Sequence, residues 1–219
     1  MLFRSNISAD DNAHRGAEQN HTGGGDNVGG NKITYNYHVN IGDKLQVDEK
    51  GVEVLIHNQN KIKILFLAAN PSNSSPLRLD KEMRDIGSAI NRSKDRDKFE
   101  FIKCSAVRVE DLQEALLDNS PHFVHFSGHG TTEGIALLNN QDRAEIVKSE
   151  ALAKLFKLFS NDVGCVFLNS CYSESQGKEI RRFIPNVIGM NNAVNDDAAI
   201  VFATSFYKTI AAGRGIRFA

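Results

Sequence analysis

The sequence predicts an α/β fold in which helices cover both faces of a mostly parallel central sheet. From residue 61 onward, short apolar runs alternate with segments whose apolar residues recur every three or four positions. The apolar runs are nearly continuous, as expected for strands buried on both faces. The chain has 219 residues, of which 41% are hydrophobic and 13 are Phe. This is enough for one domain with a substantial core.

The strands and helices are expected to alternate along residues 61–213. Strands are predicted at 61–69, 99–107, 122–128, 163–170 and 186–190, and helices at 77–90, 109–118, 149–159, 175–183 and 197–213. Two further runs, 134–139 and 144–147, predict a small hairpin. Ser149 is expected to cap the helix that follows it, and Gly213 to end the last helix. Ligands gather at the carboxyl ends of parallel strands, so functional residues are expected there.

The first 60 residues have a different composition. Residues 11–32 hold six glycines and only three apolar side chains, which predicts a flexible Gly/Asn-rich tail over 1–32. Apolar and polar residues alternate over 33–41, the pattern of a half-buried strand that could pair with 52–56. The pattern GDNVGGNKI and this alternation resemble short amyloid-like signalling motifs of bacterial and fungal defence proteins. Residues 22–41 therefore suggest self-assembly through stacked strands, and a hairpin packed on the domain is the alternative.

Charge and cysteine content exclude several classes of function. Lys and Arg total 26 against 27 Asp and Glu, so the chain lacks the basic excess of a protein that binds nucleic acid through phosphates. The longest apolar stretches are six residues, against about 20 for a membrane span, and no secretory signal is evident. Three cysteines without zinc-type spacing argue against disulfides and a metal site. The expected location is the reducing cytoplasm.

Two of the predicted strands end next to reactive side chains. His129 follows the strand at 122–128, and Cys171 follows the strand at 163–170. Strands that are neighbours in a sheet lie about 4.8 Å apart, so a thiol and an imidazole at the same ends can meet. Such a pair forms a nucleophile and its base. We therefore expect Cys171 to attack a carbonyl after His129 has taken its proton.

The two loops also offer supporting groups. The backbone amides of Gly130 and Cys171 are the natural candidates for an oxyanion hole. Asn169 and Ser170 are expected to fix the nucleophile loop. The remaining cysteines, together with two histidines in or near apolar runs, are expected to be ordinary core residues: Cys104, Cys165, His122 and His125.

The same residues carry a family resemblance. KILFLAANP, LRLDKEMRDI, HFVHFSGHG, VFLNSCYSESQ and VIGMNNAVNDDAAIVFATSFY occur in this order along residues 61–214, which resemble the CHAT family of caspase-like cysteine peptidases. The resemblance implies a caspase-like three-layer sandwich, cleavage of proteins or peptides, and no metal or cofactor in the chemistry. It places the catalytic dyad on Cys171 and His129. It also places Asp196 where an acid binds substrate Lys or Arg, although Asp196 could equally cap the last helix.

The resemblance further predicts more chain after residue 219. CHAT domains normally continue beyond GRGIRFA through another helix and strand, so the strand at 186–190 is expected to be an exposed sheet edge. A dimer that shares this edge, a truncated product and an arbitrary boundary are the alternatives. The expected organisation is a tail at 1–32, a short β segment at 33–60 and a CHAT domain at 61–219.

Three functions remain in consideration at this point. The first is a cysteine endopeptidase that uses Cys171 and His129. The second is a catalytically weak caspase-like scaffold that acts as an interaction and signalling module. The third is a small-molecule or nucleotide-binding domain, which fold class alone suggests and which the absence of a glycine fingerprint disfavours.

Overall fold

The computed structural model describes residues 45–47, 53–55 and 61–219. Within the first two segments, strand β1 (Leu45–Val47) pairs antiparallel with strand β2 (Glu53–Leu55). The strand expected near 52–56 is therefore present, and its partner among the described residues is β1. The predicted tail at 1–32 and the predicted strand at 33–41 lie outside the described residues.

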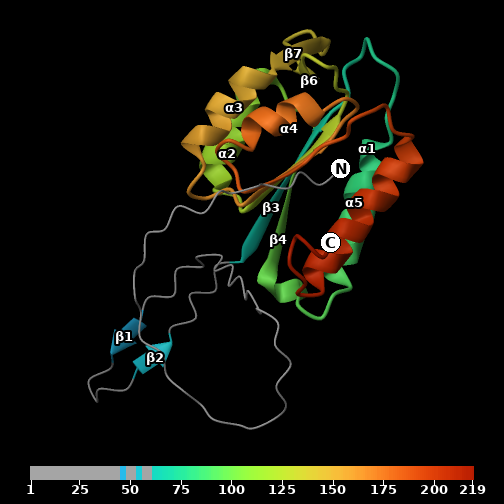
Figure 1. Ribbon diagram of the computed structural model, residues 1–219. Helices are drawn as coiled ribbons and strands as arrows, with labels where there is room; N and C mark the ends of the chain where they lie inside the picture. Colours follow the sequence, from blue (N-terminus) through green and yellow to red (C-terminus); the bar gives the residue numbers. More distant parts are fainter. Residues whose placement is uncertain (1–44, 48–52, 56–60) are drawn as a thin grey trace, which may run out of the picture.

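A five-stranded parallel sheet forms the centre of the domain (Figure 1). The spatial order of its strands is β4-β3-β5-β8-β9, so β4 and β9 are the edges. The strands are β3 (Ile62–Ala69), β4 (Phe99–Cys104), β5 (Phe123–Gly128), β8 (Cys165–Asn169) and β9 (Asn186–Ile188). All four pairings are parallel, which places every carboxyl end at the same side of the sheet.

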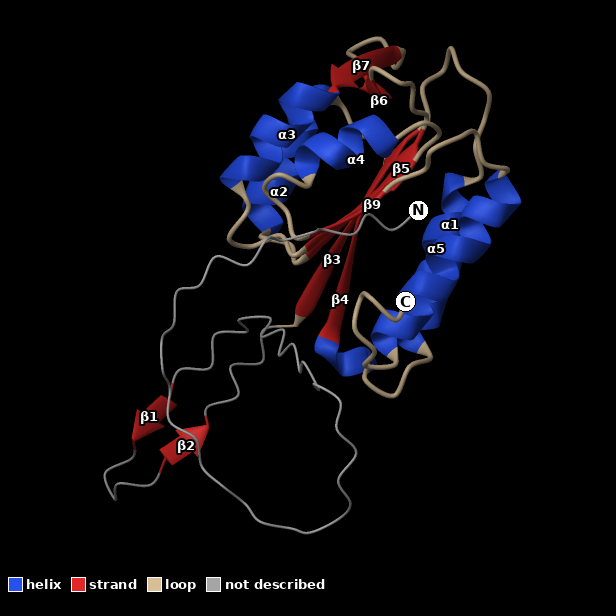
Figure 2. Ribbon diagram, in the orientation of Figure 1, coloured by secondary structure: helices blue, strands red, loops and turns tan. Residues whose placement is uncertain are grey.

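Helices cover both faces of this sheet (Figure 2). Helices α1 (Leu79–Asn91) and α5 (Asp196–Ala211) lie on one face. Helices α2 (Val109–Asn119), α3 (Ser149–Leu158) and α4 (Glu174–Ile180) lie on the other. Alternate residues of each strand enter opposite cores, as the period of two in a strand requires: Phe66 packs with α1 and α5, whereas Leu65 packs with the other three helices. The predicted α/β sandwich with a mostly parallel sheet is confirmed.

Two smaller elements complete the domain. The short helix η1 (Arg96–Lys98) leads into β4. The antiparallel hairpin of β6 (Gly134–Leu138) and β7 (Ala144–Lys148) follows β5 and confirms the predicted hairpin. Among the described residues, no helix is both long enough and apolar enough to cross a bilayer.

The ends of three elements differ from or sharpen the predictions. The strand predicted at 99–107 ends at Cys104, before Ala106 adopts a positive φ of 54°. The predicted cap at Ser149 is wrong: Ser149 is the first residue of α3, and its hydroxyl donates to the carbonyl of Glu133 instead. Gly213 lies just beyond α5 with φ of 77°, a left-handed conformation that confirms it as the stop.

Candidate active site

The sheet brings His129 and Cys171 to the same edge. Strands β5 and β8 are neighbours, and Ser127 is directly opposite Asn169 in the register. His129 and Cys171 each lie two positions beyond one of these paired residues, so they leave the same ends of adjacent strands. Both side chains are half-buried. The predicted neighbourhood of the two loops is therefore present in the fold.

The backbone of Gly130 contacts the turn that carries Cys171. A Cβ atom added at residue 130 would lie 2.5 Å from the carbonyl oxygen of Cys171 and 2.9 Å from the Ser170 side chain. A side chain at residue 130 would clash with a backbone carbonyl, and only a shift of the backbone could relieve the clash. Glycine is therefore the residue that fits at this position. The two residues predicted to form the oxyanion hole, Gly130 and Cys171, are thus adjacent in space. Their role as a hole remains a prediction.

Two hydrogen bonds fasten the loop after β5 to the start of α4. The Ser175 hydroxyl donates to the Thr132 carbonyl at 2.9 Å, and the side-chain amide of Gln176 donates from Nε2 to the Thr131 carbonyl at 3.0 Å. Gln176 is fully buried. These two hydrogen bonds hold the loop that carries His129 beside the segment that follows Cys171.

The imidazole of His129 is oriented by a backbone carbonyl. Its Nε2 atom lies 2.8 Å from the carbonyl oxygen of Ser75, in the loop after β3. A carbonyl can only accept, so Nε2 carries the hydrogen and Nδ1 is the ring nitrogen with a free lone pair. Within the described part of the chain His129 forms no hydrogen bond to Cys171. Catalytic hydrogen bonds often tighten only when substrate binds.

The turn that carries Cys171 is tightly constrained. Tyr172 has a φ of 56°, a left-handed conformation that non-glycine residues rarely adopt, and its side chain is exposed. The buried Ser173 hydroxyl lies 2.8 Å from the Ser170 carbonyl and accepts a hydrogen bond from the Met190 amide. The turn is therefore fixed both to itself and to the segment after β9.

A buried carboxylate lies behind the two loops. Glu82 of α1 is 2% exposed, and its side chain accepts hydrogen bonds from His125, Ser127 and Asn169. Glu82 is not among the functional residues predicted from the sequence. The signal was present, because Glu82 is three residues after Leu79 and four before Ile86, on the face of the helix that packs against the sheet. A charged residue on an apolar face is unusual unless it has partners.

Other expectations have mixed outcomes. His125 is a fully buried core residue, and Cys165 is fully buried, which raises the pKa of its thiol to about 12. Cys104 is only half-buried at the end of edge strand β4, so its predicted burial holds in part. His122 is half-buried, its Nδ1 accepts a hydrogen bond from the Lys63 amide, and burial lowers the pKa of its ring.

Asp196 is engaged in an ion pair at the start of α5. Its carboxylate lies 2.8 Å from Nε of Arg78, which also pairs with Asp197. The alternative in which Asp196 caps the helix is wrong, because Asn195 caps it by accepting from the Asp197 amide. Arg78 follows Ser75 by three residues, so the same loop reaches both His129 and Asp196. A role for Asp196 in binding substrate remains a prediction.

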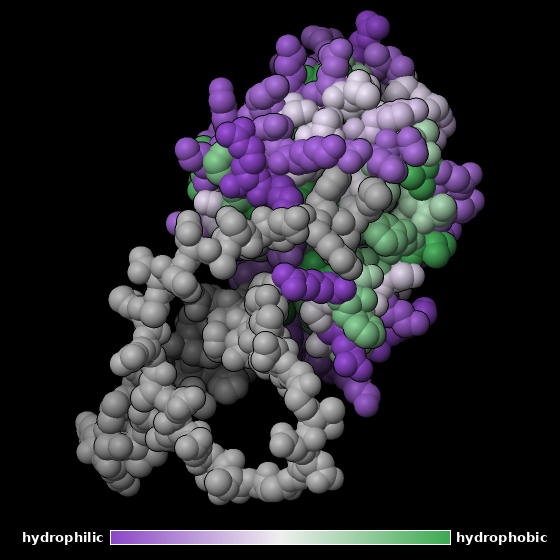
Figure 3. All heavy atoms as spheres, in the orientation of Figure 1, coloured by the Kyte–Doolittle hydropathy of each residue, from purple (hydrophilic) through white to green (hydrophobic). Residues whose placement is uncertain are grey.

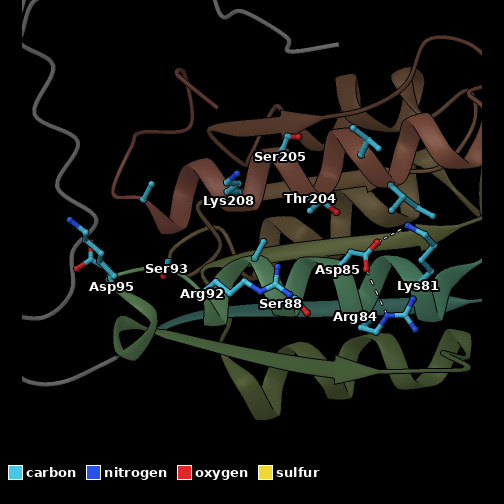
Figure 4. Close-up of a pocket in the computed structure, with 15 residues that line it drawn as sticks. Lys81, Arg84, Asp85, Ser88, Arg92, Ser93, Asp95, Thr204, Ser205 and Lys208 are labelled. Atoms are coloured by element: carbon cyan, nitrogen blue, oxygen red, sulfur yellow. Dashed lines mark hydrogen bonds and ion pairs between the residues drawn. The ribbon is translucent and has the colours of Figure 1, made fainter.

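A groove of about 840 Å³ lies elsewhere, between α1 and α5 (Figure 4). Its rim is largely basic, with Lys81, Arg84 and Lys208 facing it and Asp85 paired to the first two. Figure 3 shows hydrophobic residues at the surface over α5, where the Val201 side chain is exposed. None of the residues that line the groove comes from the His129 or Cys171 loops.

Much of the chain is similar to proteins that are named as proteases or probable proteases. It is 29% identical over 193 residues to a Roc-COR-CHAT protease from an unknown prokaryotic organism, a match covering 84% of this chain and 18% of the relative. It is 23% identical to a probable protease of Gillisia limnaea, over 77% of this chain and 30% of that relative. A Roc-COR-CHAT protease of Runella zeae is 24% identical over 68% of this chain and 16% of its own length. The chain thus spans less than a third of each of these relatives.

Solved structures also overlap the chain. The lysine decarboxylase LdcF of Francisella novicida gives a TM-score of 0.35 at 14% identity, over 68% of this chain and 18% of that chain, too low to bear on function. The family comparison is more direct. Residues 53–219 match the CHAT domain, which includes every strand of the central sheet and both loops of the candidate site. The chain therefore belongs to the CHAT-domain family, and its similarity to named proteases supports a protease-like function.

Proposed function

We propose that this domain is a cysteine endopeptidase in which Cys171 is the nucleophile and His129 is the general base. The observation that carries the proposal is the pairing of β5 with β8, which delivers both side chains to one end of the sheet. The contact between Gly130 and the Cys171 carbonyl adds that the two loops meet there. The protease names of the relatives agree with this chemistry.

The orientation of His129 defines the proton path. Because Nε2 donates to the Ser75 carbonyl, Nδ1 is the atom that takes the proton from the Cys171 thiol. The thiolate attacks the peptide carbonyl carbon, and the amides of Gly130 and Cys171 stabilise the oxyanion that forms. The protonated ring then gives its proton to the leaving amine as the C–N bond breaks. In the second half, His129 deprotonates a water that hydrolyses the thioester and frees Cys171.

Asp196 gives the proposed enzyme a preference for basic residues. Its carboxylate is partly exposed and already binds one guanidinium, that of Arg78. A substrate Lys or Arg side chain would compete with Arg78 for the same oxygens. The proposed substrates are therefore proteins or peptides with Lys or Arg at the cleaved bond.

The direct test is cleavage of a peptide library by the wild-type chain and by Cys171→Ala. We expect the wild-type protein to cleave, with products that end in Lys or Arg, and the variant to lose at least a thousandfold in turnover. Cys104→Ala is the matched control, since it removes a half-buried thiol far along the sheet and should retain activity. Equal turnover by wild type and Cys171→Ala would remove the assignment.

One observation favours a second candidate, a catalytically weak scaffold. Among the described residues His129 and Cys171 share no hydrogen bond. A scaffold predicts that alkylation of Cys171 by iodoacetamide follows the pH profile of an ordinary thiol and is unchanged in His129→Ala. An active dyad predicts faster alkylation at neutral pH that His129→Ala abolishes.

A further inference from the structure

The carboxylate of Glu82 connects the two strands that carry the proposed dyad. One oxygen, Oε2, accepts from the Ser127 hydroxyl of β5. The other, Oε1, accepts from the Asn169 side chain of β8 at 2.6 Å. Ser127 precedes His129 by two residues, and Asn169 precedes Cys171 by two. A single side chain of α1 therefore forms hydrogen bonds to both strands at equivalent positions, two residues before His129 and Cys171.

The environment of this carboxylate is suited to holding it in one place. Its third donor is Nε2 of His125, at 3.0 Å, and the His125 ring stacks between Phe66 and Phe167 with centroid distances of 4.7 and 4.8 Å. Burial alone raises the pKa of Glu82, but the hydrogen bonds from its three donors, together with the electrostatic interaction with His125, outweigh burial and lower the pKa. An ionised carboxylate can accept from all three donors, which a neutral amide of the same shape cannot do.

We propose that Glu82 is a positioning residue, which ties the ends of β5 and β8 together and thereby sets the placement of His129 relative to Cys171. This inference rests on the proposed function. Buried ionic groups are weak evidence for stability, since an apolar residue of similar volume often serves as well. The Glu82 carboxylate binds Ser127 and Asn169, the last side chains of β5 and β8 before each loop. This placement indicates that it fixes the geometry of the two loops.

Replacement of the carboxylate by an isosteric amide tests the inference. In Glu82→Gln the bond with the Ser127 hydroxyl must reverse its direction, and the negative charge that strengthens all three hydrogen bonds is lost, so the two strand ends are held more weakly. We expect kcat on a Lys or Arg peptide to fall about thirtyfold while KM changes less than twofold. We also expect the pH profile of Cys171 alkylation to move toward that of His129→Ala.

Ile86→Val is the matched control. Ile86 is the next buried residue on the same face of α1, and the substitution destabilises the packing without touching the three donors. When each protein is assayed at a temperature the same number of degrees below its own melting temperature, Ile86→Val should keep the wild-type kcat and alkylation profile. If Glu82→Gln does not fold, Ser127→Ala and Asn169→Ala each remove a single donor and should show the same shift in alkylation to a smaller extent.

Hydrogen exchange separates this inference from the proposed function. In Glu82→Gln, amides at 128–131 and 169–172 should exchange at least tenfold faster together, while those of α2 keep their protection, whether or not the chain cleaves peptides. Unchanged exchange at either segment overturns the inference, as does a kcat loss equally large in Ile86→Val. Accelerated exchange in a chain that shows no cysteine-dependent cleavage would support the role of Glu82 in holding the ends of β5 and β8 together. It would overturn both the catalytic role of that contact and the peptidase assignment.

Discussion

The two faces of the central sheet are built differently. The face toward α2, α3 and α4 is covered by aliphatic and aromatic side chains, among them Val124, Phe126 and Leu168. The face toward α1 and α5 is equally well buried but carries His125, Ser127 and Asn169 from the same strands. In β5 and β8, one side of the strand thus contributes apolar packing alone, and the other contributes packing and a polar network. We therefore expect the apolar face to contribute mainly to stability and the polar face to contribute to the geometry of the candidate site.

The largest expected effect on stability is on the apolar face. Leu116 of α2 is fully buried in the core of that face. Leu116→Ala should lower the free energy of unfolding by about 2–5 kcal/mol, because it removes buried methyl groups and leaves a cavity. Urea unfolding measures this loss, and peptide turnover well below the melting temperature should stay within twofold of wild type. A large kcat loss would show that the two faces are not separable.

Acid should weaken the polar face selectively. The pKa of Glu82 is lower in the folded chain than its ordinary value of 4.5, despite the opposing effect of burial. The stability that follows from this shift is present above the unfolded pKa and is lost as pH falls through the folded one. His125 and Tyr207 are the titratable groups that face it from β5 and α5.

Unfolding curves between pH 7 and pH 3 measure this dependence. The wild-type chain should lose more stability over that interval than Glu82→Gln, since all other carboxylates are common to both proteins. Identical curves would mean that the ionised carboxylate does not contribute to the polar face.

A smaller effect is expected at the start of α5, where the polar face meets the proposed substrate site. Asp196→Asn should reduce kcat/KM on Lys and Arg peptides about tenfold, or about 1.4 kcal/mol. Stability should change little, because exposed ion pairs contribute about 0–1 kcal/mol. Arg78→Ala removes the competing guanidinium and should lower KM on the same peptides. A loss that is equal on uncharged peptides would contradict the assigned preference.

The smallest effect is expected beside Cys171. Tyr172 holds a φ of 56°, which a glycine adopts without steric cost. Tyr172→Gly should raise the unfolding free energy by less than about 1 kcal/mol, because relief of strain is partly offset by the entropy of glycine. Tyr172→Ala, which keeps the steric cost, is the control in thermal unfolding. Equal melting temperatures for the two variants would show that the turn stores no strain.

The fold was largely predictable because buried elements have a strong periodic signal. The strand at 61–69 and the helix at 77–90 were expected nearly at the bounds of β3 and α1. His129 and Cys171 were predictable as a pair because each directly follows an apolar strand. The Ser75 contact to His129 was not, since it uses a backbone carbonyl 54 residues away and leaves no mark on side-chain identity. Glu82 lies on the apolar face of α1, but its three partners lie 43, 45 and 87 residues further along the chain, so the helical period alone does not identify them.

The eight residues from Ser75 to Glu82 make contacts of three kinds. The Ser75 carbonyl accepts a hydrogen bond from the His129 imidazole, and Arg78 forms ion pairs with the two aspartates at the start of α5. Glu82 accepts hydrogen bonds from β5 and β8. A small slide of the first turn of α1 would disturb all three at once. The three roles proposed for these contacts, which are orientation of the base, recognition of a basic residue and alignment of the nucleophile, then cannot be adjusted independently. Substitutions that move this turn should alter turnover and selectivity together.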